Sequence, residues 1–351
     1  IMVKKEDNTV DLEDVKETEV SETEEEKLDN ITNDIDYSVD QLEGVGAVTK
    51  KKLEAFGLTS IIDICVRGAK EVSEIAGVDK HKADSWVFGC QKILEDKGII
   101  RKSDMSTVEL MEYQENLPAI ETKAKGVDDL LGGGIKPEAT YEIYGEFGSG
   151  KTQFCNSLAV ETIHDGKNIV WIDCEDTFKP RRIVEILMAR GYVEDKEEAL
   201  QYLNRITYFY CPNTEQLMGT INNLSSTLME KSPPLLILDG AIGQFREEYL
   251  GRGTLAERQM QLARLMTHLK NISYYFRNTV VFTNQVQSDP AMMFGDPIKP
   301  IGGNVVGHAS TYRIYFKKSG KKRVARMVDS PEHPQADAEF VLSVEGLKDP
   351  E

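Results

Sequence analysis

One stretch limits the fold more than any other, namely Gly145-Glu146-Phe147-Gly148-Ser149-Gly150-Lys151-Thr152, or GEFGSGKT. It fits the pattern G-x-x-x-x-G-K-[ST], follows the β-prone run at 141–144, and precedes a helix-compatible segment that starts at Gln153. In this context the glycines let backbone N–H groups converge on phosphate oxygens at a helix N-terminus. We expect Lys151 to reach the β- and γ-phosphates and Thr152 to offer its hydroxyl to Mg²⁺. The alternative is a glycine-rich turn before an ordinary helix, which does not require all four defining residues.

Strand and helix signals alternate along the chain that surrounds this motif. Strands are predicted at 141–144, 168–172, 206–210, 235–238 and 279–283, with helices after Gly150 and at 181–190, 215–229 and 255–276. Such alternation predicts an α/β fold with a mainly parallel sheet covered on both faces and ligands at the carboxyl ends of the strands. Further strands are predicted at 312–317, 323–328 and 338–343.

Composition divides the chain into four regions. Residues 1–36 hold fourteen Asp and Glu against four Lys, so this stretch carries −10 of the net charge of −17. A segment so acidic and so poor in aromatic residues is expected to stay disordered, as a solvating tail or, alternatively, an interaction tail. We expect a small all-α domain at 37–95, a charged linker at 96–125, and the α/β core at 126–351.

Within the all-α region, Leu42 to Leu53 reads as a helix end, a tight turn on Gly44 and Gly46, and a second helix opening near Ala47. The segment is similar to a helix-hairpin-helix, in which turn amides meet a DNA phosphate and nearby lysines, here led by Lys50, add charge. The alternative is a glycine-punctuated helical pair whose lysines are only solvated. The segment alone does not decide between the two.

Polar residues follow three of the predicted strands. Asp239 ends one of them and is a candidate to hold the Mg²⁺ of a nucleotide, directly or through water, although such a carboxylate can be a simple helix cap. Glu175 follows another and is the candidate for orienting the water that attacks the γ-phosphate. Asn284 and Gln285 end a third, where their amides are candidate γ-phosphate contacts. For Asp173 and Asp176, which lie on either side of Glu175, the alternative is that they only cap the next helix.

Two segments after these strands are candidate DNA loops. The segment 286–305 is long and glycine-rich and ends in Gly303 and Asn304, while 245–254 carries Arg246 and Arg252. Loops with Arg, Gly and apolar residues beside a nucleotide site suit a flexible polyanion such as single-stranded DNA. Each alone could equally be a connector.

Two further features bear on where the protein works. The five cysteines are scattered without any C-x-x-C pair, which predicts reduced core thiols and not zinc ligands or disulfides. No run approaches about eighteen apolar residues and no signal-peptide core is evident. We therefore expect an intracellular, cytoplasmic protein with no membrane partner.

Taken together, these motifs resemble the RecA/RadA recombinase family, especially its archaeal RadA-type members. The resemblance runs from about 37 to 346, and its most specific blocks are GEFGSGKTQ, IDCEDTFKP, FREEYLGRGTLAERQ, TNQVQ, GDPIKPIGGN, GHASTYRIYFKK and RVARMVDSP. It implies a RecA-like P-loop ATPase core after a helix-hairpin-helix domain. The implied function is an ATP-dependent DNA recombinase that forms filaments on single-stranded DNA and exchanges strands with duplex DNA. Mg²⁺ is the implied cofactor, and mediator or paralogue proteins are implied partners.

The resemblance also implies roles for single residues. Lys151, Glu175 and Gln285 would be catalytic, and Thr152 and Asp239 would bind the metal. Nucleotide contacts would involve Arg182, at the base, and His308, which with Gln285 couples the γ-phosphate to the DNA loops. The remaining nucleotide contacts would come from Gly145, Glu146, Phe147, Gly148, Ser149, Gly150, Gln153 and Asp239. DNA contacts would come from Arg246, Arg252, Gly303, Asn304, Gly44, Gly46 and Lys50.

The chain departs from the family at two places on the implied subunit interface. Asp329, Pro331 and Pro334 match a segment that caps the neighbouring ATP, but Gln335 replaces the usual acid, which weakens the case for a monovalent cation there. A Phe-x-x-Ala docking motif is replaced by Met105 to Val108, which we expect to enter apolar pockets on the next protomer while the linker pairs with its sheet edge. The alternatives are a regulatory paralogue that assists filament assembly and a ring-shaped helicase on the same core.

Overall fold

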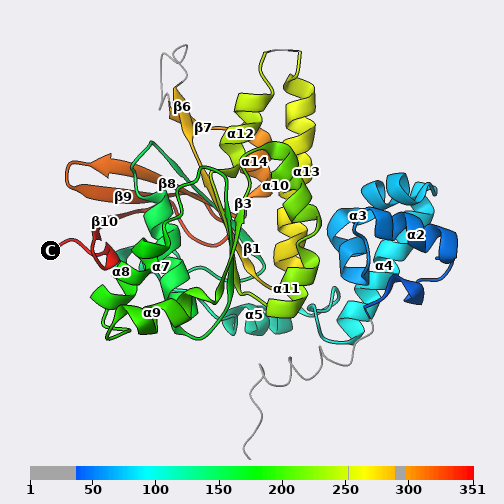
Figure 1. Ribbon diagram of the computed structural model, residues 1–351, viewed down its shortest axis with the longest axis horizontal. Helices are drawn as coiled ribbons and strands as arrows, with labels where there is room; N and C mark the ends of the chain where they lie inside the picture. The colour runs from blue at the N-terminus through cyan, green and yellow to red at the C-terminus, as the bar shows by residue number, and fades with distance from the viewer. Residues whose placement is uncertain (1–36, 252, 289–297) are drawn as a thin grey trace, which may run out of the picture. The chain divides into compact units, whose positions relative to one another are not determined.

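The structure is a computed structural model that describes residues 37–251, 253–288 and 298–351 (Figure 1). The predicted tail at 1–36, Arg252 and the middle of the predicted loop at 286–305 lie outside the described residues. The first part of the described chain is helical. It consists of the 3-10 helix η1 (Val39–Gln41) and the α-helices α2 (Ala47–Ala55), α3 (Ile61–Ala76), α4 (Lys80–Asp96) and α5 (Thr107–Glu115).

Local side-chain hydrogen bonds fix the ends of these helices. Ser60 and Asp63 form a capping box at the start of α3, and Asp79 accepts a hydrogen bond from the Lys82 N–H at the start of α4. Inside α3, Gly68 has a φ of 73° and kinks the helix. The predicted all-α region is therefore helical, although among the described residues the 3-10 turn η1 precedes the glycine turn where the end of a helix was expected.

A nine-stranded sheet forms the centre of the rest of the chain. Its strand order is β11-β10-β9-β8-β1-β5-β4-β2-β3, in which β8 to β3 run parallel and β8 to β11 antiparallel. A separate two-stranded sheet pairs β6 with β7. The strands are β1 (Ala139–Gly145), β2 (Ile169–Asp173), β3 (Ile206–Tyr210), β4 (Leu235–Asp239), β5 (Thr279–Asn284), β6 (Val286–Ser288), β7 (Ile298–Pro300), β8 (Tyr312–Ser319), β9 (Lys322–Asp329), β10 (Asp337–Ser343) and β11 (Gly346–Lys348).

Helices cover both faces of the parallel half of this sheet (Figure 1). Figure 1 shows α7, α8 and α9 on one side, with α10, α12, α13 and α14 on the other. The bounds are α6 (Lys125–Leu130), α7 (Lys151–His164), α8 (Pro180–Ala189), α9 (Lys196–Leu203), α10 (Thr214–Asn222), α11 (Ser225–Lys231), α12 (Ala241–Glu248), α13 (Leu255–Tyr275) and α14 (Gly303–Ala309). Because both faces are covered, β1, β2, β4 and β5 are buried along their whole length.

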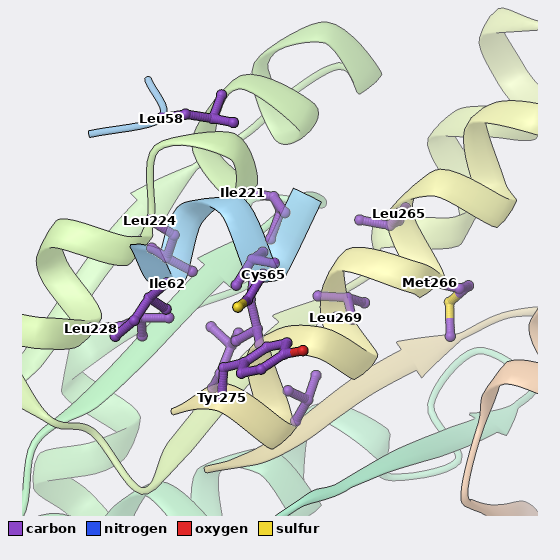
Figure 2. Close-up of a cluster of buried hydrophobic side chains, with 14 of the residues drawn as sticks. Leu58, Ile62, Cys65, Ile221, Leu224, Leu228, Leu265, Met266, Leu269 and Tyr275 are labelled. Atoms are coloured by element: carbon purple, nitrogen blue, oxygen red, sulfur yellow. The ribbon is translucent and has the colours of Figure 1, made fainter. Parts of the chain in front are cut away.

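The helical region packs on the core through apolar side chains. Figure 2 shows Ile62 of α3 beside Leu224 and Leu228, and Cys65 of α3 on the side of Leu269 of α13. These residues belong to one continuous hydrophobic cluster. A polar contact borders it, since Arg264 and His268 of α13 both bond the Glu71 carboxylate of α3.

The α/β prediction is confirmed, but four segments differ from their predicted form. The helix expected at 215–229 is broken between α10 and α11, where the Asn223 side chain donates to the Gly219 carbonyl and competes with the helix. The expected loop at 245–254 begins inside α12, because Phe245 is buried together with Ile242 and Gln244 before it. The expected loop at 286–305 includes β6, β7 and the start of α14, and the linker contains α5.

Candidate nucleotide-binding site

The phosphate loop connects β1 to α7, as its sequence pattern predicts. Gly148 and Gly150 have φ of 70° and 109°, which favours glycine, and a Cβ on Gly145 would lie 2.2 Å from the Phe316 carbonyl oxygen. Lys151 Nζ folds back on the loop and donates to the carbonyl oxygens of Gly145 and Glu146 at 3.0 and 3.2 Å. Burial lowers the pKa of Lys151, although Glu175 and Asp239 oppose this shift. A partly buried ammonium with only carbonyl partners here is suited to receive an anion.

Asp239 is the centre of a group of hydroxyls at the carboxyl edge of the sheet. Its Oδ2 accepts from Thr152 Oγ1 at 2.9 Å and from Thr177 Oγ1 at 3.2 Å, and its Oδ1 accepts from Thr283 Oγ1 at 2.5 Å. Burial raises the pKa of this carboxyl, an effect that the hydroxyl donors from Thr283 and Thr152 oppose. Oxygen ligands of this kind are what Mg²⁺ prefers.

Glu175 lies in the turn after β2, and Gln285 follows β5. Gln285 Nε2 donates to Glu175 Oε1 at 2.8 Å, so the structure brings these two predicted residues together. Gly240 lies under the same carboxylate with a φ of 86°, and a Cβ there would lie 2.4 Å from Glu175 Cγ. A larger residue at 240 would therefore displace Glu175.

Asp173 organises the turn that carries Glu175. Its carboxylate accepts backbone N–H bonds from Glu175 at 3.1 Å, Thr177 at 3.2 Å and Phe178 at 2.9 Å. The alternative reading of Asp173 as a cap of the next helix is wrong, because α8 has Lys179 as its N-cap without a side-chain cap bond, and Asp173 holds the turn before that helix. Thr177 and Thr283 escaped the sequence reasoning, yet both place hydroxyls on Asp239, and the position of Thr283 at the end of a buried strand was the available signal.

Asn284 differs from its prediction as a candidate γ-phosphate contact. Its side chain is buried on the opposite side of β5 from Thr283 and donates to Glu142 Oε1 at 2.7 Å and to the Ile301 carbonyl at 2.8 Å. Successive residues of a strand point to opposite faces, so Thr283 and Asn284 cannot both face the phosphate loop. Gln285 alone of the two amides reaches Glu175.

The remaining predicted nucleotide residues lie around this centre. Arg182 on α8 donates to Gln153 Oε1 at 2.9 Å and to the Ser343 and Val344 carbonyls at 2.6 and 3.0 Å. Phe147 is 95% exposed at the tip of the phosphate loop, and His308 is exposed on α14.

The candidate DNA residues fall into two groups. Arg246, Gly303 and Asn304 are exposed on α12 and at the start of α14, while Arg252 lies outside the described residues. In the helical region, Gly44 has a φ of 79° and Gly46 is the N-cap of α2. Lys50 bonds Asp40 at 2.5 Å, so its ammonium already has an acidic neighbour.

The candidate interface residues are at the surface. Asp329, Pro331 and Pro334 are exposed in and after the end of β9, and Gln335 donates to the Val328 carbonyl at 3.1 Å. Val108 is 59% exposed but lies in the first turn of α5, which Ser106 and Glu109 cap. The extended backbone predicted there is therefore absent at Val108, and Met105 precedes the helix.

The five cysteines are buried and free, in agreement with the prediction of core thiols. Within the described ranges, no group of His, Cys, Asp and Glu has the arrangement of a metal site made by those residues alone. In the same ranges, every helix is too short or too polar to cross a membrane.

A P-loop nucleoside-triphosphatase with a RecA-like core is the class that this fold and site define. The residues fit a nucleotide with Mg²⁺, because Ser149 Oγ is buried without a partner among the described residues and Thr152 and Asp239 place oxygen atoms together beside the phosphate loop. Residues 114–350 match the Rad51 family. The chain is also 42% identical over 329 residues to the DNA repair and recombination protein RadA of Cenarchaeum symbiosum (strain A), an alignment that covers 92% of this chain and 81% of that protein. The chain belongs to the Rad51 family and, within it, to the archaeal RadA-type recombinases.

Proposed function

We propose that this protein is an ATP-dependent DNA recombinase that assembles on single-stranded DNA, pairs it with a homologous duplex and exchanges strands. The observation that carries this proposal is the 2.8 Å hydrogen bond from Gln285 to Glu175. Gln285 directly precedes β6, the first arm of the candidate DNA loop, and Glu175 is the candidate hydrolytic residue. One hydrogen bond thus joins the residue that would activate water to the segment that would contact DNA.

The site residues would divide the work of hydrolysis among them. Lys151 and the N–H groups of the phosphate loop would bind the β- and γ-phosphates of ATP, and Thr152 and Asp239 would hold Mg²⁺. When bound, Mg²⁺ supplies positive charge that offsets the charge of the phosphates. Glu175 would accept a proton from the attacking water, while Gln285 orients its carboxylate. Arg182 and Gln153 support a proposed base contact, and the exposed His308 is proposed to sense the γ-phosphate.

DNA contact is proposed at two places. Arg246, the segment around Arg252, and the start of α14 with Gly303 and Asn304 would bind the single strand. The turn at Gly44 and Gly46 would bind duplex DNA through the α2 N-terminus. The domain division at 37–95, 96–125 and 126–351 stays part of this proposal, as does hydrolysis that depends on DNA.

Assembly into a filament or ring is proposed to use Met105. The strand β3 is an edge of the large sheet, and Phe209, Tyr210 and Leu224 line a pocket beside it. An edge strand with an adjoining pocket suits β-augmentation by an extended segment with one apolar anchor. Because Val108 begins α5, the extended part would be the residues before Ser106, with Met105 as the anchor.

The exposed segment with Asp329, Pro331 and Pro334 is proposed to cover the nucleotide of the next protomer. Gln335 stands where the family usually has an acidic residue, so a monovalent cation at that interface would have no carboxylate ligand from this position. Carbonyl oxygen atoms would have to bind it instead. Mediator or paralogue proteins remain proposed partners.

Two substitutions test the function. Lys151→Ala should weaken nucleotide-dependent DNA binding, because it removes the positive charge that would bind the phosphates of ATP. Glu175→Gln should leave ATP binding intact and slow hydrolysis. Strand exchange between a circular single strand and a linear duplex, with electron microscopy of the assemblies, measures the activity itself. Wild-type protein that binds DNA and ATP without exchanging strands would refute the recombinase and favour a regulatory paralogue, and a closed ring that unwinds duplex DNA would indicate a helicase.

A further inference from the structure

A fully buried carboxylate lies in the middle of the sheet, away from the phosphate loop's own contacts. Glu142 on β1 has no exposed surface, and β5 and β8 flank it. Its Oε1 accepts from Asn284 Nδ2 at 2.7 Å, and its Oε2 accepts from Arg313 Nε at 2.6 Å. Burying a charge is costly unless it is paired and hydrogen-bonded, and apolar residues often serve stability equally well. The position therefore calls for a reason beyond packing.

Asn284 links this carboxylate to the segment after β5. The same Nδ2 donates to the Ile301 carbonyl at 2.8 Å, and the Ile301 N–H donates to the Gln285 carbonyl at 3.0 Å. Pairing of Val286 with Pro300 continues this connection into β6 and β7. The two arms of the candidate DNA loop are thus joined at their base by the bond from Asn284 to Ile301, and Asn284 is also the residue that bonds Glu142.

Three successive residues at the end of β5 have three different tasks. Thr283 donates to Asp239 at 2.5 Å, Asn284 donates to Glu142, and Gln285 donates to Glu175 at 2.8 Å. A shift of this strand end would move all three contacts together. Two of the three also bond the returning arm at Ile301, Asn284 through its side-chain amide and Gln285 through its backbone carbonyl.

Arg313 extends the group to α14. Its guanidinium lies against Gly307, where a Cβ would be 2.9 Å from Arg313 Nη1, and it lies 5.6 Å from the ring centroid of Tyr144. α14 begins at Gly303 and carries His308. The guanidinium therefore supports the helix that follows the loop, while its Nε holds Glu142.

We propose that Glu142, Asn284 and Arg313, here called the Glu142 clamp, are positioning residues that transmit DNA binding at the loop to Glu175. The clamp fixes the base of both loop arms, and Gln285 leaves that base toward the hydrolytic carboxylate. DNA bound to the loop then changes the position of Gln285 only while the clamp holds the two loop arms together where they leave the sheet. This inference rests on the proposed function, because it assumes that the loop binds DNA and that Glu175 serves hydrolysis.

The test is the ratio of ATP hydrolysis with saturating single-stranded DNA to hydrolysis without it, measured alongside thermal melting. Glu142→Gln keeps the shape but removes the charge and presents a donor where two donors already point. Glu161→Gln is the matched control, because Glu161 is also buried and paired with an arginine, Arg190, but lies on α7 near its end remote from the phosphate loop. Coupling between sites typically amounts to about 5- to 150-fold, so Glu142→Gln should lower the ratio at least about five-fold.

Asn284→Ala is the second variant, and it decides the question if Glu142→Gln does not fold. It removes both hydrogen bonds of the amide but leaves Glu142 paired with Arg313. It should lower the ratio and speed hydrogen exchange in the peptide 298–309, whereas Glu161→Gln should lower only the melting temperature. An unchanged ratio in a folded clamp variant would overturn the proposal and leave the clamp a purely structural contact. A wild-type protein that DNA does not stimulate would instead refute the proposed function, before any variant is compared.

Discussion

Gly240→Ala tests how closely Glu175 must be placed. In the structure a Cβ at 240 would lie 2.4 Å from Glu175 Cγ, 2.6 Å from its Cδ and 2.7 Å from its Oε1. Ordinary contact begins at 3.4 Å, so the Glu175 side chain would have to retreat by about 1 Å. That movement would also break or lengthen the bond from Gln285. A displacement of about 1 Å at a reacting group can cost about 100-fold in rate, which is the expected loss in kcat.

The same substitution also introduces backbone strain, which a control separates from displacement. Gly240 has a φ of 86°, and an alanine in this region costs about 1–2 kcal/mol. Gly166 has a φ of 79° but no heavy atom within 4 Å of its would-be Cβ, so Gly166→Ala carries the strain without the collision. Both variants should lose a few degrees of Tm. Only Gly240→Ala should lose turnover.

The assay is steady-state ATP hydrolysis, with nucleotide affinity measured by a fluorescent analogue. Affinity should change little in Gly240→Ala, because Lys151 and the phosphate loop are not displaced. A kcat within about three-fold of that of Gly166→Ala would refute the assignment of Glu175, since a misplaced catalytic group should cost far more.

Four other outcomes are expected. DNA affinity should fall as the salt concentration rises, with a log–log slope of about −0.7 per phosphate neutralised, and an affinity that does not change with salt would contradict this. Removal of residues 1–36 should preserve strand exchange, and loss of exchange in that truncation would contradict the account of the tail. Met105→Asp should abolish assembly as measured by light scattering, because burial of the apolar side chain, worth about 1.5–3 kcal/mol, is replaced by a charge in an apolar pocket. Assembly of this variant at the wild-type level would refute docking by Met105. A lowered Tm of the protomer would show instead that Met105 packs on its own chain. Burial by itself raises the pKa of the Glu71 carboxyl, but hydrogen bonds from His268 and Arg264 lower it from 4.5 to about 2. The ionised Glu71 carboxylate should therefore contribute its full stabilisation above pH 4.5 and lose it as the pH falls toward 2. The Tm difference between wild type and Glu71→Gln should shrink over that range. A constant difference would contradict the lowered pKa of Glu71.

Much of the core could be predicted from the sequence because its signals are local. A buried parallel strand such as β4 is a continuous apolar run, and the phosphate loop is a fixed pattern between a strand and a helix. Asp239, Glu175 and Gln285 could be proposed as neighbours because the ends of parallel strands meet at one edge of the sheet. The resemblance added Arg182 and His308, which no local pattern singles out.

Other features depended on contacts between distant segments. The capping box at Ser106 was readable in the sequence, but the charged linker around it concealed α5. The amphipathic start of α12 was concealed by the Arg and Gly residues that follow it, and only packing against the core shows Phe245 as buried. In α12 tertiary burial decided the structure, because local propensity is weak in short elements, whereas α5 has no buried residue and begins at a local capping box.

By itself, the sequence determined the class of fold, the phosphate loop and the acidic residues at the strand ends, because each of these is encoded within a few neighbouring residues. Only the tertiary structure decided that Asn284 turns away from the nucleotide site to Glu142, and that Thr283 faces Asp239. The physical reason is strand register, since a shift of one residue would exchange the two faces of β5. That register is set by pairing with β1 and β4, whose residues are far from β5 along the chain.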